Sequence, residues 1–491
     1  MIIRKIICAI LFIFLFAAEA TFAIEEELLK QSVELKNGSI LSISDCVALA
    51  FQNSPKIKRQ KYNLDIAKSR VGIAQSQYFP VISAGVGFYN ENNSDNIYYN
   101  SYYRELPNVG VTVNKLIWNF GKTTAYIKME EFYKIGAEYE FMDSLCATLF
   151  NVKAKYYNVL KEKAMDNIAQ KNVELYEHFV KVARKKPDLL TAQVNLTHAK
   201  SDLIASQNEY KNAIVDLNNS MYIDYAPVYS IKNTPTFNLQ NSFVQKISEK
   251  DFSKEKFDFD RKDAPEIAYK NSPDLQVLIN TKKAMEQSLK YIKRTYFPDL
   301  SAGAGYGLLN TTETNNNSFH VGVNLSSSVN LMELRHGIKG AVAEVSLANN
   351  EINLFKKDLY YEINRAFNNV DKAERRVSIA QNAVNKSAEA LKLVETQYVN
   401  AQDDIDYTSY RDSINDYINS LSNYVNVLYD YNLALIQVEM AMHYHIVDIH
   451  HKSEHAVHYH SDDLIKHLVE ALNCDEHENK NKKTKTKREK L

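Results

Sequence analysis

The feature that most constrains this chain is an internal repeat whose landmarks recur at one offset of 218 residues. A duplicated supersecondary unit keeps its landmarks in one register, whereas chance rarely preserves a single offset across separated motifs. We therefore interpret the chain as two halves related by pseudo-symmetry. The repeated landmarks are Asn53-Ser54-Pro55 with Asn271-Ser272-Pro273, Tyr78–Gly85 with Tyr296–Gly303, and Asp188 with Asp406.

Glycine and proline, the residues that most often interrupt helices, are few and unevenly placed. The chain has 13 glycines and 9 prolines among 491 residues, and no glycine lies between Gly136 and Gly303. Neither residue type occurs after Gly340. Long stretches without these breakers favour continuous helix, so we predict a mainly α-helical chain. The 59 basic and 60 acidic residues balance, which argues against a general attraction to nucleic acid.

The first residues have the order of a secretory signal peptide. Arg4 and Lys5 precede the apolar run Ile6–Phe16, and the small residues Ala18 and Ala20 follow it. We predict a signal peptide at residues 1–20, with cleavage as late as residue 23. The apolar run is too short to span a bilayer as a helix. The cysteines beyond this segment are too few and too scattered for a disulfide framework.

Apolar and small residues follow the spacing of a coiled coil in the second half of the chain. From Ala341 to Tyr398 they recur in alternating steps of four and three residues, and a seven-residue spacing continues from Ile414 to Met442. A seam sustained over so many turns predicts long packed helices. A helix from about residue 340 to 402 would be roughly 90 Å long. The first half matches, with a helix from about residue 121 to 185 and a turn near residue 187.

Each half interrupts its helices at the Tyr-Phe-Pro landmark, where the periodicity changes from seven to two. In residues 81–117 and 299–329, apolar residues alternate with small or polar ones, which predicts two β-hairpins. An apolar face toward lipid and a polar face toward a wet lumen is the pattern of a membrane-spanning β-strand. The residues predicted to face the lumen are Ser83, Gly85, Thr112, Asn114, Ser301, Gly303, His320 and Asn324.

Two hairpins cannot form a closed structure in lipid by themselves. Open sheet edges would leave backbone groups unpaired there, so several chains must share one barrel. Three chains would supply twelve strands around an aqueous bore. The alternative is two amphipathic hairpins packed on a soluble domain. Aromatic residues at the hairpin ends favour the membrane, because they would form an interfacial girdle; they are Tyr78, Phe79, Trp118, Phe120, Tyr296 and Phe297.

Four segments carry a resemblance to a known family. They are the opening of the first repeat, Leu41–Pro55, its counterpart Ile267–Leu275, the strand-to-helix junction Leu116–Lys122, and the tip segment Asp188–Gln193. In order, spacing and duplication they resemble the TolC-type outer-membrane efflux and type I secretion channel family. The resemblance covers roughly residues 40–220 and 263–442.

The resemblance implies a homotrimer in which a twelve-stranded outer-membrane β-barrel is continuous with a periplasmic α-helical barrel. It also implies three kinds of partner: outer-membrane lipid, a periplasmic adaptor protein, and an inner-membrane transporter of the ABC or RND type. Such ducts are passive, so neither an enzyme activity nor a cofactor is expected. The sequence has no nucleophile elbow, phosphate-binding loop or zinc-protease motif.

Members of the family close their periplasmic end by coiling the helix tips inward, often around a ring of acidic residues. Three copies would gather these carboxylates around one axis and favour cations. The alternative is that Asp406 begins a helix, where an aspartate suits the orphan amides and the helix dipole. By resemblance, the gate residues of this chain are Asp406, Asp404, Asp403 and Asp188.

The repeats define the expected domain organisation. The first repeat is predicted at residues 24–220 and the second at residues 263–442, with tips near residues 187 and 404. Residues 221–262 between them break both periodicities. The resemblance implies that this stretch is an equatorial linker that helps to form a belt around the middle of the helical tube.

Residues 443–491 form a tail rich in histidine and, at its end, in lysine. Histidine-rich tracts bind divalent zinc, nickel or copper, so a divalent metal is one interpretation of the tail. The alternative is a solvated, disordered tail without a defined site. The candidate metal ligands are His443, His445, His450, His451, His455, His458 and His460.

We therefore interpret the chain as an outer-membrane exit duct that passively conducts substrate from an inner-membrane transporter and its adaptor to the exterior. Two alternatives stay open. A trimeric coiled-coil structural or surface protein would share the helical seams but would have no through-pore. A metal-efflux duct would explain the histidines, and loss of the tail should then sensitise cells to metal but not to dyes.

Overall fold

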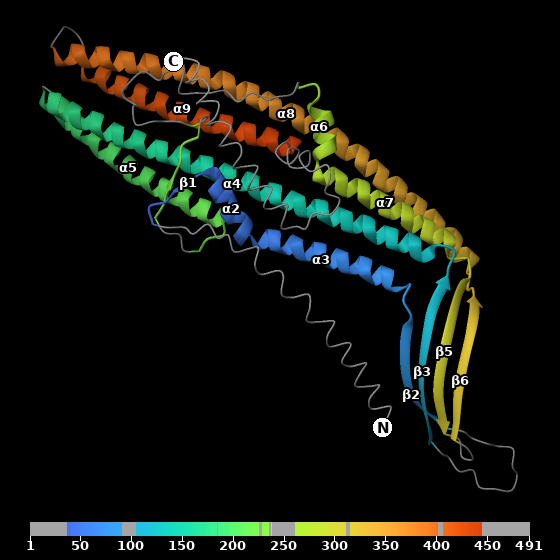
Figure 1. Ribbon diagram of the computed structural model, residues 1–491. Helices are drawn as coiled ribbons and strands as arrows, with labels where there is room; N and C mark the ends of the chain where they lie inside the picture. The colour runs from blue at the N-terminus through green and yellow to red at the C-terminus, as the bar shows by residue number, and fades with distance from the viewer. Residues whose placement is uncertain are drawn as a thin grey trace, which may run out of the picture. The chain divides into compact units, whose positions relative to one another are not determined.

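The computed structural model describes residues 37–90, 105–183, 185–224, 228–234, 237, 261–310, 315–400 and 406–443. Within these ranges the chain is mainly helical, with a four-stranded antiparallel sheet and a short two-stranded parallel one (Figure 1). The predicted fold class, long helices and two-stranded hairpins in a tandem repeat, is confirmed. None of the described helices has a stretch long and apolar enough to cross a membrane.

The two repeats contain the same elements in the same order. The first comprises α2 (Ile43–Asn53), α3 (Pro55–Ser76), β2 (Val81–Asn90), β3 (Glu105–Trp118), α4 (Lys122–Val182) and α5 (Lys186–Ser220). The second comprises α6 (Ala264–Asn271), α7 (Pro273–Arg294), β5 (Asp299–Asn310), β6 (Asn315–Ser326), α8 (Leu331–Val399) and α9 (Tyr407–Met442). The remaining described strands are β1 (Ile40–Leu41) and β4 (Ser230–Ile231).

The single offset conceals two differences in length that nearly cancel. In the first hairpin β2 ends at Asn90 and β3 begins at Glu105, whereas in the second β5 ends at Asn310 and β6 begins at Asn315. The longer first connection is offset by the helices, because α4 has 61 residues and α8 has 69. The repeats therefore share one order of elements but differ in the lengths of their helices and hairpin connections.

The repeated Asn-Ser-Pro landmark breaks and restarts a helix. Ser272 is the N-cap of α7, its hydroxyl accepts a hydrogen bond from the amide of Leu275, and proline follows at the first helical position. In the first repeat the hydroxyl of Ser54 accepts a bond from the amide of Ile57. Serine satisfies an orphan amide and proline lacks the donor that would be orphaned there, so this pair starts α3 and α7 in the same way.

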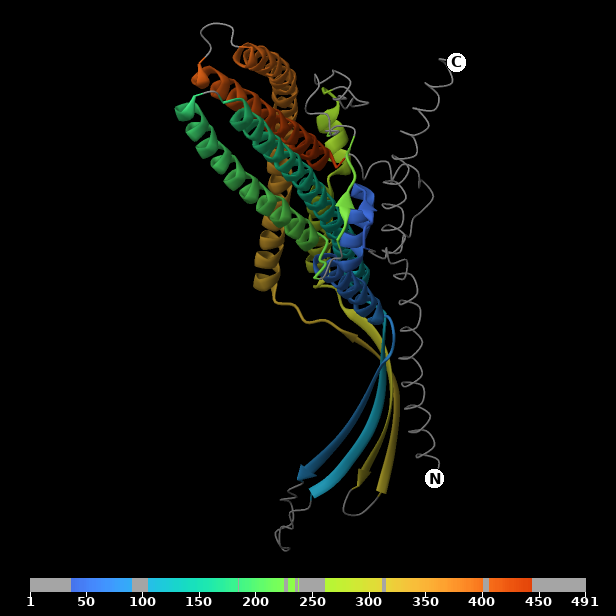
Figure 2. The same cartoon turned by 90° about the vertical axis from the view of Figure 1, so that its left-hand side faces the viewer.

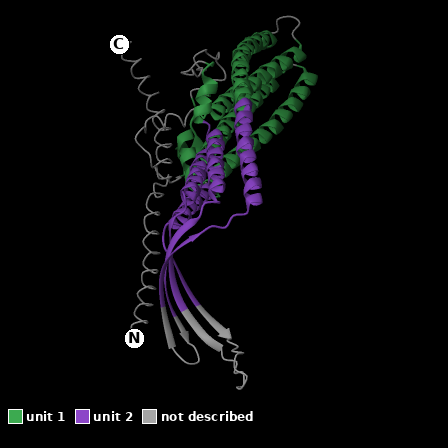
Figure 3. Ribbon diagram, turned by 90° about the vertical axis from the view of Figure 1, so that its right-hand side faces the viewer, with its two compact units in different colours: residues 1–57, 144–271, 359–491 green, residues 58–143, 272–358 purple. Residues whose placement is uncertain are grey.

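The chain divides into two compact units, each built from both repeats (Figure 3). The first unit comprises residues 1–57, 144–271 and 359–491, and the second comprises residues 58–143 and 272–358. The sheet of β2, β3, β5 and β6 belongs to the second unit. The C-terminal parts of α4 and α8, together with α5 and α9, belong to the first.

In the first unit α5 lies beside α4, and α9 beside α8 (Figures 1 and 2). Ion pairs of 2.7 Å between Lys155 and Asp216 and of 2.9 Å between Arg376 and Asp430 join these helix pairs. The seven-residue seam predicted for α9 is buried, as expected for a coiled coil. Its buried residues include Tyr410, Ile414, Tyr417, Leu421, Tyr424, Leu428, Tyr431 and Leu435.

The described parts of residues 221–262 are anchored on the first unit. β4 pairs in parallel with β1, and the buried Tyr156 hydroxyl donates to the Lys232 carbonyl at 2.6 Å and lies 3.0 Å from the Leu41 carbonyl. At the other end of this stretch, Arg261 donates to the side chain of Asn368 at 2.7 Å. The linker is therefore fastened near both of its ends.

In the second unit a buried carboxyl on α4 faces acidic neighbours. Burial, together with the nearby charges of Asp274 and Glu140, raises the pKa of Asp143 to about 6. Burial also raises the pKa of Asp274, in the first turn of α7. The folded chain therefore binds more protons here than the unfolded chain, and stability falls as pH rises toward 6.

Asp143→Asn should remove this loss. At pH 7.5 the variant is expected to be more stable than the wild type by about 1 kcal/mol, after allowance for solvent screening. At about pH 3, below the unfolded-state pKa of 3.8, Asp143 is protonated in both states and the two should be equal. Thermal melts at both pH values test this, with the exposed Asp358→Asn as the matched control. A gain that does not depend on pH would contradict the assignment.

Candidate functional site

The four-stranded sheet joins the two repeats. Its strand order is β2-β3-β5-β6, so β3 of the first hairpin pairs antiparallel with β5 of the second. Among the described strands, β2 and β6 each pair along one side only. The outer edges of this sheet therefore present unpaired backbone groups, which are templates for another strand.

The register places all the predicted lumen residues on one face of the sheet. Ser83 is opposite Thr112, Thr112 is opposite Gly305, and Gly305 is opposite His320, so one line of small and polar residues crosses every strand. Opposite residues share a face, and the faces alternate with a period of two. The remaining predicted residues belong to the same face: Gly85, Asn114, Ser301, Gly303 and Asn324.

Side chains from neighbouring strands cover two glycines of this polar face. The amide of Asn114 lies over Gly303 and the imidazole of His320 lies over Gly305, and a Cβ at either glycine would collide with them. Glycine is needed at these positions because longer side chains cross them.

The opposite face is apolar and bare. Val321 and Val323 on β6 are each 70% exposed, and Ile82 on β2 is 69% exposed. Exposing a row of branched apolar side chains to water is unfavourable, so such a face marks contact with a membrane or a partner. The aromatic residues at the helix-proximal end of the hairpins are exposed too, and include Tyr78, Phe79, Trp118, Phe120 and Tyr296.

Charged side chains connect the two repeats where the hairpins meet the helices, and we call this group the charged junction. Lys122 forms an ion pair of 2.6 Å with Asp299, and its ammonium donates to the Phe297 carbonyl at 3.0 Å. The guanidinium of Arg294 donates to the carbonyl of Gly121 at 2.9 Å. Gly121 has a φ of +81°, which favours glycine, and a Cβ there would collide with Arg294. Sequence reasoning missed the charged junction, although charged residues beside apolar strands indicated it.

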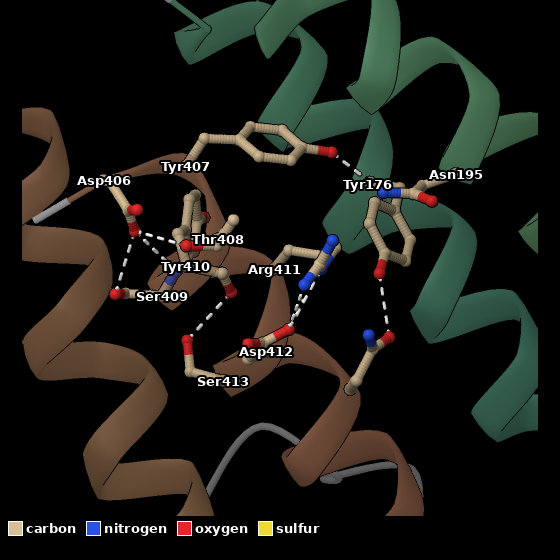
Figure 4. Close-up of polar contacts among 11 residues, drawn as sticks. Tyr176, Asn195, Asp406, Tyr407, Thr408, Ser409, Tyr410, Arg411, Asp412 and Ser413 are labelled. Carbon is tan, nitrogen blue, oxygen red and sulfur yellow. Dashed lines mark hydrogen bonds and ion pairs between the residues drawn. The ribbon is translucent and has the colours of Figure 1, made fainter.

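At the tip of the first unit, Asp406 is the N-cap of α9 (Figure 4). Its carboxylate accepts hydrogen bonds from the Thr408 hydroxyl at 2.6 Å and from the Ser409 amide at 3.0 Å. These bonds, the Thr408 hydroxyl first, lower the pKa of Asp406. The helix-start role considered from sequence is therefore real, and a gate role would be additional. Asp188 lies in the first turn of α5, and Asp403 and Asp404 lie outside the described residues.

An aromatic cluster gathers the helix ends at this tip. The ring of Phe179 on α4 lies with its centroid 4.4 Å from that of Tyr410, 5.0 Å from that of Tyr407 and 5.8 Å from that of Tyr398. Phe179 is fully buried. With Tyr176, these residues form what we call the tip cluster.

Hydrogen bonds extend the tip cluster to α5 and along α9 (Figure 4). The Tyr176 hydroxyl donates to the side chain of Asn415, and the Asn195 amide on α5 donates to the Tyr407 hydroxyl, both at 2.8 Å. Burial raises the pKa of Tyr176 to about 12, so its hydroxyl stays a donor above the pH at which a tyrosine ordinarily ionises. The tip cluster thereby connects α4, α5, α8 and α9.

The metal interpretation has little support among the described residues. His443 is the C-cap of α9, with a φ of 49°, and burial lowers its pKa to about 4, so it is neutral at pH 7. The other candidate ligands, from His445 to His460, lie outside the described residues. Within the described ranges no group of three His, Cys, Asp or Glu side chains is placed to hold a metal ion.

Two substitutions at Asp406 separate its capping role from its charge. Asparagine caps helices about as well as aspartate, so Asp406→Asn removes the charge and keeps the cap, whereas Asp406→Ala removes both. If the carboxylate contributes to a cation-binding ring, both variants should lose block of the pore by divalent cations. Currents across planar bilayers measure this. Block that survives in Asp406→Asn and fails only in Asp406→Ala would assign Asp406 to capping alone.

Comparison with known proteins identifies the family of this chain and covers both of its repeats. The family model described as outer membrane efflux protein matches residues 47–221 and 264–438, which is most of the chain and both repeats. The chain belongs to this family, and the resemblance found in the sequence is confirmed. As a member of it, the protein is a channel component rather than an enzyme. No protein of curated function matches the chain by sequence alone.

Solved structures of outer-membrane channels share the fold. The CmeC channel of Campylobacter jejuni is 15% identical with a TM-score of 0.66, over 86% of this chain and 92% of that one. VceC of Vibrio cholerae is 12% identical with a TM-score of 0.66, over 82% and 95%. The open state of MtrE from Neisseria gonorrhoeae is 11% identical with a TM-score of 0.68, over 84% and 95%.

Proposed function

We propose that this protein is the exit duct of a tripartite efflux or type I secretion system, embedded in the outer membrane. The observation that carries the proposal is the sheet: one face small and polar, the other apolar and exposed, and two edges unpaired among the described strands. A lipid-facing surface and a water-facing surface on one sheet are what the wall of a pore requires.

Three copies complete the wall. Each chain brings four strands in one sheet, and an open edge in lipid would leave its amides and carbonyls unsatisfied. Twelve strands are enough to leave a water-filled bore. The polar faces, including Thr112 and Asn324, then line the lumen, while Val321 and its neighbours contact lipid.

The long helices form the periplasmic part of the duct. In this proposal residues 1–20 direct export and are removed, and the helices of three copies close a tube whose belt includes residues 221–262. The tip cluster holds the helix ends together at rest, and Asp406 and Asp188, with Asp403 and Asp404, supply the acidic ring at the constriction.

The duct is passive, and its partners supply direction and energy. A periplasmic adaptor engages the helical tube, and an inner-membrane transporter of the ABC or RND type loads the substrate.

Reconstitution tests the proposal. The full chain, purified from outer membranes and added to planar lipid bilayers, should give discrete ion-conducting steps. A trimer that inserts or aggregates but never conducts, even with its tip cluster disrupted, would favour the structural coiled-coil protein without a pore. Transport assays of the deletion strain, comparing sensitivity to dyes with loss of a secreted protein, then separate efflux from type I secretion.

A further inference from the structure

The internal repeat predicts a pairing between two β-strands that a single chain cannot form. Within the chain, β3 of the first repeat pairs with β5 of the second. By pseudo-symmetry the repeat-equivalents of these strands are β6 and β2, the two edges of the sheet. They cannot meet each other in one four-stranded sheet, but β6 of one copy can meet β2 of the next.

We propose that β6 pairs with β2 of the next copy in the register that β3 and β5 keep, with Ser326 opposite Gly85. This inference rests on the proposed function, and specifies which residues join the copies. A head-to-tail contact of this kind closes into a ring when copies are related by rotation.

The register follows from the pairings inside the chain. Gly303 is the repeat-equivalent of Gly85 at the offset of 218 residues. Gly85 is opposite Gly110 and Gly303 is opposite Gly322, so Gly110 is equivalent to Gly322. Counting four residues along each strand makes Asn114 equivalent to Ser326. Since Asn114 is opposite Gly303, Ser326 should be opposite Gly85 of the next copy.

The space at Gly85 supports this register. Gly303 lies under the side chain of Asn114 from the neighbouring strand, whereas a Cβ at Gly85 meets nothing within 4 Å. The same glycine is thus covered in the repeat that has a neighbour and open in the repeat that lacks one. Ser326 of the next copy would cover Gly85 as Asn114 covers Gly303.

The junction between strand and helix shows the same unfilled contact. Phe120 stacks on Phe297 within the chain, with ring centroids 4.9 Å apart. The repeat-equivalent of Phe297 is Phe79. Asn119 accepts a bond from the Thr123 amide at the start of α4, and Asn330 accepts one from the Met332 amide at the start of α8.

β3 has one extra residue at the register shift between Leu116 and Trp118, so beyond it Asn119 corresponds to Asn330 and Phe120 corresponds to Leu331. Leu331 is 74% exposed and Phe79 is 67% exposed. Both side chains belong to the faces that two copies would bring together, so the exposed pair takes the place of the stacked one.

The charged junction has no counterpart in the proposed contact between copies. Lys122 pairs with Asp299, and Arg294 donates to Gly121. The repeat-equivalents of Asp299 and Arg294 are Val81 and Ser76. The seam between copies therefore relies on backbone hydrogen bonds and apolar contact, and the seam inside the chain has ionic contacts in addition.

Cysteine cross-linking of the full chain in outer membranes tests the register. Opposite residues on antiparallel strands have Cα atoms within disulfide range, whereas pairs two residues out of register lie beyond it. The test pair is Ser326→Cys with Gly85→Cys in one chain. The matched control is Ser326→Cys with Ser83→Cys, and each single variant gives the background from native thiols, of which Cys46 and Cys146 are buried.

The in-register pair should give several-fold more intermolecular disulfide than the control pair, in a ladder that ends at three chains and collapses on reduction. Should the first pair fail to insert, Asn324→Cys with Gly87→Cys probes the same register. Equal or stronger cross-linking of the shifted pair in an assembled oligomer overturns the register and leaves the duct intact. A protein that is monomeric before oxidation overturns both.

Discussion

Val321→Arg is expected to prevent stable insertion of the protein into the outer membrane. Val321 is in the middle of β6 on the bare apolar face, and an arginine on the lipid side of a barrel costs about 2–4 kcal/mol near the midplane. A shared barrel repeats the change in every copy, so the total cost multiplies. The amount of folded protein in the outer-membrane fraction measures the effect.

The adjacent residue supplies the matched control. His320 belongs to the polar face, opposite Gly305, so His320→Arg places the same charge on the lumen side. This variant should insert normally and conduct, with a reduced preference for cations. If Val321→Arg inserts as well as His320→Arg, the apolar face does not contact lipid, and the proposed wall is wrong.

Phe179→Ala should raise the resting conductance of the duct strongly. Phe179 is the fully buried centre of the tip cluster, and truncating a buried phenylalanine to alanine costs about 3–5 kcal/mol. Loss of that packing weakens the contact of α4 with Tyr398, Tyr407 and Tyr410, which we propose holds the tip closed. The measurement is the current through the purified protein in planar bilayers, without adaptor or transporter.

Phe150→Ala distinguishes a tip effect from general destabilisation. Phe150 is buried on the same helix, where it packs with Cys146 and Ile436 in a separate core cluster. This variant should lower the melting temperature by an amount similar to that of Phe179→Ala without raising the resting current. Equal currents in both variants would show that the tip cluster is ordinary core and not a closure.

Much of the fold could be predicted because it is periodic. The offset of 218 residues predicts equal repeats, the four-and-three spacing from Ala341 to Tyr398 predicts a long helix, and alternation at Ser83 and Gly85 predicts a strand with two unlike faces. Each pattern depends on local geometry, which the sequence carries directly.

The rest depends on which elements meet in space. α4 is shorter than α8, and a longer first hairpin connection offsets the difference at Asp188 and Asp406. Periodicity indicates that Phe179 and Tyr410 are inside, but not that their rings are in contact. The pair of Lys122 with Asp299 likewise joins different repeats, and only the paired sheet brings them together.

The candidate gate was predictable in part. An aspartate before a helix start is a recognised N-cap, and Asp406 has that role with Ser409 as its donor. Whether its carboxylate also contributes to a ring depends on the other copies of the chain. That property belongs to the assembly, so it is tested by the conductance of Asp406→Asn.

Several copies of this chain are expected to share one cylinder, because among the described strands a single chain leaves two edges of its sheet unpaired. Native mass spectrometry of the full chain, extracted from outer membranes in mild detergent, tests this most directly. A barrel shared by three chains should give a species with three times the mass of one mature chain. A water-soluble monomer, with its hairpins folded onto its own helices, would contradict it.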